Sequence, residues 1–514
     1  MGYLSKVKLL NKLKTIGTTL LIILLTTTLL LYQGVLIVRA STIRVPEDYA
    51  TIQSAIDHAS PGDIITVKAG VYSGFKVTKS LTIMGESNQT VVVKDSVEVD
   101  ANNVKVGSLK IILEESTGSS TALKIMGNNT NLVGVIIESY KDAVQLGTVD
   151  HEISGTLIEY SRIKSGQTGI FGACKDLAIF FSEVESGGLA IAPCNYLDLE
   201  FSRITGDTAV SSSLWSTGFV IRNNYINGKS TGIYLDGDHH TISNNVITGG
   251  GGIALGARGV IIENNTISTS GTGIAVTKEN NVIIRNTISS GGYAIELAGN
   301  GNMILNNTLT GGRGVNVESG YGNTIAFNLI NMTGNVGIYL SKYTGDNLVY
   351  GNTFWYCYNY EAADESGKNQ WYLENETHKL GNYWSYNKAQ DNDGDGITDA
   401  PYHIATTTGL EILDKYPLAR PLVNPYQTPS TTTSTQPPRT ITPPQNTTQV
   451  ETKWSKTQTS TQITSPGVYT SSTTLETSGV MNTQYIVISS IGVVFILVIV
   501  FILLRARRNR SQVG

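Results

Sequence analysis

The acidic segment DNDGDGITD, residues 391–399, has the residue types and spacing of a metal-binding loop. Alternating carboxylates in a glycine-containing loop place hard oxygen ligands around one Ca²⁺ ion. The twelfth position holds Tyr402 instead of the bidentate glutamate of an EF-hand. The segment therefore predicts a Ca²⁺ loop of its own type, with a solvated acidic turn as the alternative. The predicted ligands are Asp391, Asp393, Asp395 and Asp399.

A second polar concentration is the segment DGDHH, residues 236–240. Carboxylates and imidazoles bind metal ions, and they also hydrogen-bond the hydroxyl groups of sugars. The segment is a candidate ligand or metal site, and a polar turn without such a role is the alternative. Its candidate residues are Asp236, Asp238, His239 and His240.

Cys174 and Cys194 lie 20 residues apart, which is close to the repeat period described below. In adjacent coils of a repeat their Cα atoms would be about 5 Å apart, within disulfide range. Outside the cell they are free to oxidise. A disulfide and a stacked pair of free thiols both remain open, and Cys357 has no counterpart at this spacing.

These candidates need a scaffold, and residues 221–354 supply a repeating one. Units such as ISNNVI, IENNTI and ILNNTL recur, with one asparagine spaced 21, 20, 21, 21, 21 and 24 residues from the next. A fixed period near this length indicates a solenoid, and each unit contains short alternating strands without room for a helix. The sequence therefore predicts an all-β parallel β-helix. The repeated residues are Asn224, Asn245, Asn265, Asn286, Asn307, Asn328 and Asn352.

The repeated asparagine has two architectural explanations. Asparagine accepts the left-handed backbone conformation, and stacked amides hydrogen-bond from one coil to the next. We therefore predict a structural ladder at this position instead of a ligand site. The apolar residues two positions later should point into the core: Ile226, Ile247, Ile267, Ile288, Leu309 and Ile330.

Both ends of a solenoid need covers, because an open coil exposes sheet edges. In residues 49–59, Ile52, Ala55 and Ile56 lie at helical spacing and predict a short amphipathic helix before a strand at 64–67. The aromatic run FWYCYNY, with Trp371 and the pair YW at 383–384, would cover the other end.

The two termini predict export and membrane anchoring. A lysine-rich start is followed by an apolar run, which is typical of a signal peptide, with an uncleaved membrane segment as the alternative. An uncharged stretch of 20 residues followed by arginines predicts a transmembrane helix with a cytoplasmic tail. The predicted organisation is a leader at 1–40, a β-helix at 41–354, an aromatic and Asp-rich cap at 355–423, a Thr/Ser/Pro-rich disordered stalk at 424–480, the transmembrane helix at 485–504 and the tail at 505–514.

Composition narrows the possible partners. Only 15% of the residues are charged and the net charge is −4, so nothing here would neutralise phosphates, and we expect no nucleic acid partner. Asn-x-Ser/Thr motifs fit an exported glycoprotein. The candidate glycosylation sites are Asn88, Asn128, Asn264, Asn306, Asn331, Asn375 and Asn446.

Residues 43–421 carry a family resemblance. The run IRVPEDYATIQSAIDHASPGDIITVKAGVY resembles the start of pectin-lyase-like right-handed β-helices. The repeat G-I-x-L…I-x-x-N-x-I resembles the NosD-like periplasmic copper-binding family, and the blocks ADESGKNQW, GNYWSY and LDKYPLARP are similar to its archaeal surface members. The resemblance implies a right-handed single-stranded β-helix. The segment DNDGDGITD also resembles thrombospondin type 3 and dockerin-like calcium loops.

The resemblance also implies copper, which this sequence supports only weakly. Copper needs soft Met or Cys ligands or suitably spaced histidines. Of the six histidines only His239 and His240 adjoin, and the methionines do not cluster.

Enzymes with this fold suggest polysaccharide cleavage as another function. Their hydrolases pair aspartates with Gly-His-Gly and Arg-Ile-Lys motifs, and here Arg162-Ile163-Lys164 stands alone. Their lyases place a basic residue beside an acidic Ca²⁺ cluster, and Asp236 and Arg258 lie about one coil apart.

The sequence thus favours a membrane-anchored extracellular β-helix that binds a ligand or glycan or serves as a structural rod. A polysaccharide lyase or hydrolase and a copper-binding accessory protein are the alternatives. The expected partners are the membrane and an extracellular glycan or surface-layer protein. Candidate binding residues that share no obvious column are Tyr234, Tyr293, Tyr321 and Tyr339.

Overall fold

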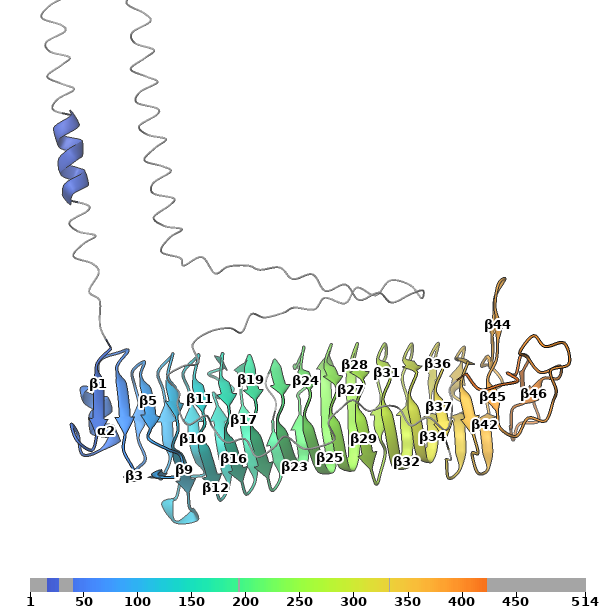
Figure 1. Cartoon of the computed structure of the whole chain (residues 1–514), viewed down its shortest axis with the longest axis horizontal. Coiled ribbons are helices and arrows are strands. Elements are labelled where there is room, and N and C mark those ends of the chain that lie inside the picture. The colour runs from blue at the N-terminus through green and yellow to red at the C-terminus, as the bar shows by residue number, and fades with distance from the viewer. Residues whose placement is uncertain (1–15, 27–39, 193–194, 332, 423–514) are drawn as a thin grey trace, which may run out of the picture. The chain divides into compact units, whose positions relative to one another are not determined.

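The computed structural model describes residues 16–26, 40–192, 195–331 and 333–422 (Figure 1). Residues 16–26 form a helix. Within the described ranges, no helix has the length and apolar character needed to cross a membrane. The predicted stalk, transmembrane helix and basic tail lie outside the described residues, as does most of the predicted leader.

Residues 42–384 form a right-handed parallel β-helix, the hand expected of crossover connections (Figure 1). One sheet contains 15 strands, each from a different coil, which gives about fifteen turns. The fold predicted from the 21-residue period is therefore confirmed. In stacking order this first sheet consists of β1 (Thr42–Val45), β2 (Ile64–Val67), β5 (Thr82–Gly85), β8 (Lys105–Gly107), β11 (Asn131–Val133), β15 (Leu157–Glu159), β19 (Leu177–Phe180), β22 (Leu197–Glu200), β24 (Val220–Arg222), β26 (Thr241–Ser243), β28 (Ile261–Glu263), β31 (Val282–Ile284), β33 (Met303–Leu305), β36 (Thr324–Ala326) and β40 (Leu348–Tyr350).

A second sheet of 24 strands makes up the remaining faces of the solenoid. In sequence order it contains β3 (Gly70–Ser73), β4 (Lys76–Val77), β6 (Val91–Lys94), β7 (Val97–Val99), β9 (Lys110–Leu113), β10 (Thr121–Ile125), β12 (Ile136–Ser139), β13 (Asp142–Leu146), β16 (Arg162–Ser165), β17 (Thr168–Gly172), β20 (Glu183–Ser186), β21 (Leu189–Ile191), β23 (Arg203–Ser211), β25 (Tyr225–Asp238), β27 (Val246–Arg258), β29 (Thr266–Thr269), β30 (Ile274–Val276), β32 (Thr287–Leu297), β34 (Thr308–Val317), β37 (Leu329–Asn331), β38 (Val336–Leu340), β41 (Thr353–Trp355), β42 (Tyr360–Asp364) and β45 (Tyr383–Trp384).

Short elements complete the described fold. A 3-10 helix spans Glu115–Thr117. Two-stranded parallel pairs join β14 (Ile153–Ser154) to β18 (Cys174–Lys175) and β35 (Gly320–Tyr321) to β39 (Thr344–Gly345). Antiparallel pairs join β43 (Leu373–Glu374) to β44 (Lys379–Leu380) and β46 (Tyr402–His403) to β47 (Leu413–Asp414).

The apolar core follows the predicted register. Ile226 pairs with Ile247 in the next coil, and Ile247 pairs with Ile267. All six residues predicted to point inward are at most 1% exposed. Because each coil places the same residue type at the same position, the core is a set of continuous aliphatic columns.

The N-terminal cover has the predicted form. Helix α2 (Ile52–His58) begins with a capping box between Thr51 and Ser54, and it buries Ile52, Ala55 and Ile56 against the first coils. The predicted strand at 64–67 is β2.

The repeated asparagines form the predicted ladder, with one refinement. In Asn245, the side-chain oxygen accepts from the backbone N–H and the side-chain nitrogen of Asn224, and the side-chain nitrogen donates to Asn265 at 3.0 Å. The left-handed residue is the one before each rung: Asn223 and Asn244, for example, have φ values of 60° and 56°. The Asn-Asn pair therefore divides the two roles that the sequence assigned to one position.

The ladder begins with serines. The backbone N–H of Ser161 donates to the hydroxyl of Ser182, that of Ser182 to Ser202, and that of Ser202 to the Asn224 amide oxygen. Each serine hydroxyl donates in turn to the carbonyl two residues before it, as Ser182 does to Phe180 at 2.8 Å. Serine and asparagine therefore act as equivalent acceptors along one column.

A second ladder, which the sequence analysis missed, runs parallel to the first. The side-chain nitrogen of Asn302 donates to Asn323, and that of Asn323 donates to Asn347. Its buried rungs are Asn281, Asn302, Asn323 and Asn347, followed by the partly exposed Asn369.

Both ladders end on a buried carboxylate. The Asn382 N–H and the Trp384 indole N–H donate to Asp414 at 2.7 and 2.9 Å. Asp364 accepts in the same way from Asn369 and from the Trp371 indole. Because every amide donates toward the C-terminal end, the last rung must be an acceptor, which a carboxylate supplies.

Aromatic packing covers this end of the solenoid. Trp384 stacks between Phe354 and Tyr402, with ring centroids 4.3 and 4.2 Å apart, and Trp371 is fully buried. Parallel pairing continues past residue 354, since β42 pairs with β38 and β45 with β41.

Candidate functional site

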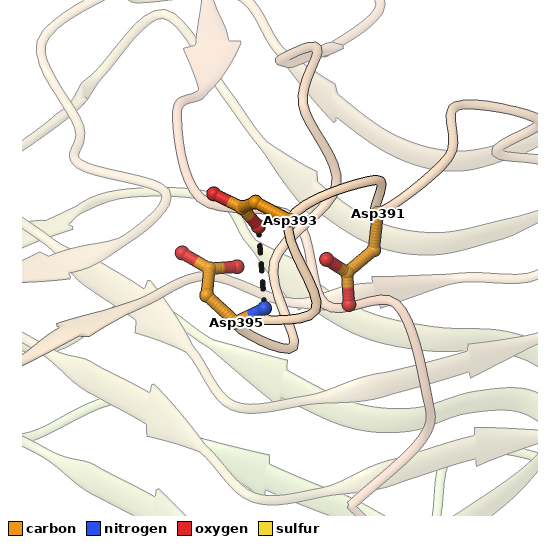
Figure 2. A group of neighbouring side chains, drawn as sticks. All are labelled: Asp391, Asp393 and Asp395. Carbon is orange, nitrogen blue, oxygen red and sulfur yellow. Dashed lines mark hydrogen bonds between the residues drawn. The ribbon is translucent and has the colours of Figure 1, made fainter.

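The acidic loop at 391–399 brings three of its four predicted ligands together (Figure 2). Asp391, Asp393 and Asp395 each offer one oxygen, and these oxygens lie within 4.8 Å of one another. The backbone turns inside the ring, since the N–H of Gly394 donates to Asp391 at 2.7 Å and that of Ile397 donates to Asp395 at 2.8 Å. Such a set of hard oxygen donors suits a cation of the Ca²⁺ type.

The fourth predicted ligand, Asp399, is held elsewhere. One of its carboxylate oxygens accepts from the side chain and the backbone N–H of Asn392, and Asp399 does not belong to the three-carboxylate group. The base of the loop is fixed by backbone bonds from Thr398 to Pro417 and from Ala419 to Gly396. The loop therefore adjoins the segment that ends the first ladder.

The turn at 236–240 does not assemble its four candidates around one point. His240 is 1% exposed, its Nδ1 accepts from the Phe219 N–H at 3.1 Å, and its Nε2 lies 2.9 Å from the Asp236 carbonyl oxygen. Both ring nitrogens are thus used within the fold, and burial lowers the pKa of His240. Asp238 forms an ion pair with Arg258 at 2.9 Å.

Copper fits the described residues poorly. The three carboxylates of the acidic loop form the one cluster of at least three His, Cys, Asp or Glu side chains found within the described ranges. Imidazoles and thiols are absent from that cluster, and carboxylates are the ligands of harder cations. Copper chemistry therefore has no assembled donor set in this part of the chain.

The other sequence candidates have these positions. Cys174 is buried in β18, whereas Cys194 lies outside the described residues, so their pairing stays a prediction. Cys357 is buried, and burial raises its pKa to about 11. Arg162 and Lys164 pair with Glu183 and Glu185 in the next coil.

The sequons differ in accessibility. Asn306 and Asn375 are exposed, Asn88, Asn128, Asn264 and Asn331 are partly buried, and Asn446 lies outside the described residues. An oligosaccharide needs an exposed amide, which favours the first two.

A groove of about 590 Å³ crosses three coils of the second sheet. Tyr293 of β32, Arg313 of β34 and Tyr339 of β38 line it, together with Tyr343. Arg313 donates to the Tyr293 hydroxyl at 3.0 Å and lies over that ring. The groove thus joins two of the tyrosines that the sequence singled out, whereas Tyr234 and Tyr321 lie outside it.

Asn316 lies in the middle of this groove and is only 4% exposed. It pairs in register with Glu296 on one side and with Tyr339 on the other. Within the described part of the chain its amide makes no hydrogen bond. A buried polar group without a partner costs about 1–3 kcal/mol, so this amide is suited to a bound polar ligand.

Two carboxylates lie beside the groove. Glu296 and Glu318 are in hydrogen-bonding contact, and burial together with the Glu318 charge raises the pKa of Glu296. Among the described residues Arg313 has no carboxylate within ion-pair distance. The groove therefore offers donors, acceptors and aromatic surface side by side.

The period of the repeat contained the signal for this groove. Register partners are 21 residues apart at Thr308 and Leu329, 23 at Val315 and Ile338, and 24 at Gly320 and Thr344. The extra residues fall where Asn335 and Tyr343 reach the groove. A lengthened coil within a regular solenoid marks such a site.

Comparison with known proteins gives the following matches. No curated protein matches the chain. A PL6 alginate lyase solved with a trisaccharide is 14% identical, with 66% of this chain and 91% of that chain covered and a TM-score of 0.40. The tailspike of E. coli bacteriophage HK620, solved with a hexasaccharide, is 12% identical, with coverages of 60% and 73% and a TM-score of 0.39. We base no argument on these structural likenesses. Residues 201–389 match the family model of the periplasmic copper-binding protein NosD, so these coils, which include the groove, are similar to the NosD family.

Proposed function

We propose that this chain is a non-catalytic surface rod that presents a ligand-binding flank outside the cell. The observation that carries the proposal is the groove across β32, β34 and β38, with the unpartnered Asn316 amide at its centre. A solenoid of stacked coils with both ends covered gives such a groove a rigid backing.

Anchoring and partners form part of the same proposal. Residues 485–504 would hold the chain in the membrane, and residues 424–480 would hold the β-helix away from it. The partner would be an extracellular glycan or a surface-layer protein. Ca²⁺ bound by Asp391, Asp393 and Asp395 would stabilise the covered C-terminal end of the solenoid.

Surface labelling of intact cells tests the location. Cells expressing the full chain are treated with a membrane-impermeant biotin reagent, and the membrane pellet is washed with carbonate. We expect labelled chain that stays in the pellet. Removal of residues 485–504 should release it. Chain that is unlabelled on intact cells but labelled after lysis would refute the proposal.

Polysaccharide cleavage is the second candidate, because Glu296 and Glu318 lie together at the groove. Two-carboxylate glycosidases keep their carboxyl groups about 5 Å or more apart. The hydrogen-bonding contact here is shorter than that arrangement, which favours binding over hydrolysis. The release of reducing or unsaturated sugar ends on incubation with polysaccharides would overturn this preference.

A further inference from the structure

The groove at β32, β34 and β38 indicates the chemical class of its ligand. Its polar groups include both donors and acceptors: the Arg313 guanidinium, the Tyr339 and Tyr343 hydroxyls, the Asn316 amide and the Glu318 carboxylate. A ligand that pairs with all of them must itself carry many groups that both donate and accept. Hydroxyl groups have this property.

The aromatic surface adds a second requirement. The Tyr293 ring is covered by Arg313 and the Tyr343 ring by the Lys342 ammonium at 5.0 Å. Tyr339 is partly exposed and borders Asn316 in register, so its ring lies beside the unpartnered amide. A flat face with C–H groups and a rim of hydroxyls would pack on this ring while pairing with the amide.

The charges of the groove exclude a strongly charged ligand. Arg313 and Lys342 supply two cations, and Glu296 and Glu318 supply two carboxylates. A polyanion would meet the carboxylate pair, and nothing at the groove gives an excess of positive charge. The ligand that fits donors, acceptors and an aromatic ring without net charge is an uncharged sugar.

We infer that the groove lined by Tyr293, Arg313, Asn316 and Tyr339 binds a neutral polysaccharide. The chain of sugar rings lies across the three coils, with one ring on Tyr339 and its hydroxyls on Asn316 and Glu318. The inference rests on the proposed function of a ligand-binding flank. It goes further by fixing the ligand class and the residues that contact it.

Calorimetric titration of the detergent-solubilised full chain tests this inference. The probes are a neutral β-glucan, a neutral α-glucan and a mannan, with alginate and polygalacturonate as acidic polymers. We expect at least one neutral polymer to bind tenfold more tightly than either acidic one. Preference for an acidic polymer, or no binding to any of the five, would overturn the inference.

Matched variants locate the site. Tyr339→Ala should weaken binding of the neutral polymer at least tenfold, whereas Tyr196→Ala, a tyrosine 45% exposed several coils away, should change it less than twofold. Equal affinities of the two variants would show that the groove is not the site. Thermal melting by circular dichroism establishes that both variants are folded.

A charge variant tests the reason for the preference. The double substitution Glu296→Gln and Glu318→Gln removes both carboxylates, and we expect the affinity for alginate to rise at least threefold. An unchanged affinity for alginate would refute the role given to the carboxylates. Because location is measured by surface labelling, a chain that is at the surface and binds no polysaccharide refutes this inference alone.

Discussion

Replacement of a single ladder rung, Asn286→Ala, should strongly destabilise the β-helix. The Asn286 amide oxygen accepts from the backbone N–H and the side chain of Asn265 at 2.9 and 3.0 Å. Its nitrogen donates to the Ile262 carbonyl at 2.9 Å and to Asn307 at 3.1 Å. The residue is 1% exposed, so water cannot replace these partners in the folded chain.

The magnitude follows from the groups that are left unpaired. The buried N–H of Asn265 loses its acceptor, which costs about 1–3 kcal/mol, and the net loss of the bond to Ile262 adds about 1 kcal/mol. We therefore expect the free energy of unfolding to fall by about 2–4 kcal/mol. Urea unfolding of the full chain, followed by tryptophan fluorescence, measures this change.

The chain itself offers a partial rescue. Serine already serves as a rung at Ser182, where it accepts the N–H of the preceding coil and donates to the carbonyl two residues before it. Asn286→Ser should therefore keep two of the bonds and cost about half as much as Asn286→Ala.

Ser289→Ala, an exposed position on the same strand, is the control, with an expected change within about 0.5 kcal/mol. If Asn286→Ala costs no more than this control, or if serine is no better than alanine at residue 286, the account of the ladder is wrong.

Three further predictions concern the ends and the core. Burial raises the pKa of Asp414 to about 6, above an unfolded value near 3.9, so the stabilisation is present below about pH 4 and is lost as the pH rises through about 6. This loss, at most about 3 kcal/mol, should be missing from the pH profile of unfolding for Asp414→Asn. Ca²⁺ at tenfold its dissociation constant should stabilise the chain by about 1.4 kcal/mol in thermal melts, and Asp393→Asn should abolish the effect; a chelator that leaves the wild-type melt unchanged would exclude the site. Ile267→Ala should cost about 2–5 kcal/mol in urea, whereas the exposed Ser268→Ala should cost little, and equal costs would contradict the register.

Local signals in the sequence were sufficient to predict the scaffold. The period near 21 residues and the alternation around Ile247 and Ile267 depend on neighbours in the same or the next coil, so the fold and the inward positions could be read directly. The second ladder carries an equally regular spacing at Asn302 and Asn323 and was overlooked because a single asparagine column was followed.

The site was harder to predict because it depends on departures from the repeat. Asn316 and Tyr339 face each other only because the register between β34 and β38 differs from that of the preceding coils. Likewise, Asp399 has the right spacing for a fourth ligand, but competition from Asn392 holds it away from the other three carboxylates. Such competition between side chains is a property of the folded loop and leaves no pattern in the sequence.

The one-way direction of the ladders makes the whole coil a natural unit of duplication. An inserted coil of about 21 residues would accept from the rung before it and donate to the rung after it, so the hydrogen-bond count would stay balanced. The solenoid would grow by about 4.8 Å, the spacing between strands. Only the final coil, which carries Asp414, could not be copied into the middle without meeting a donor it does not supply. The length of the β-helix can therefore change by whole coils in evolution or design, while the terminal carboxylates keep their place at the end.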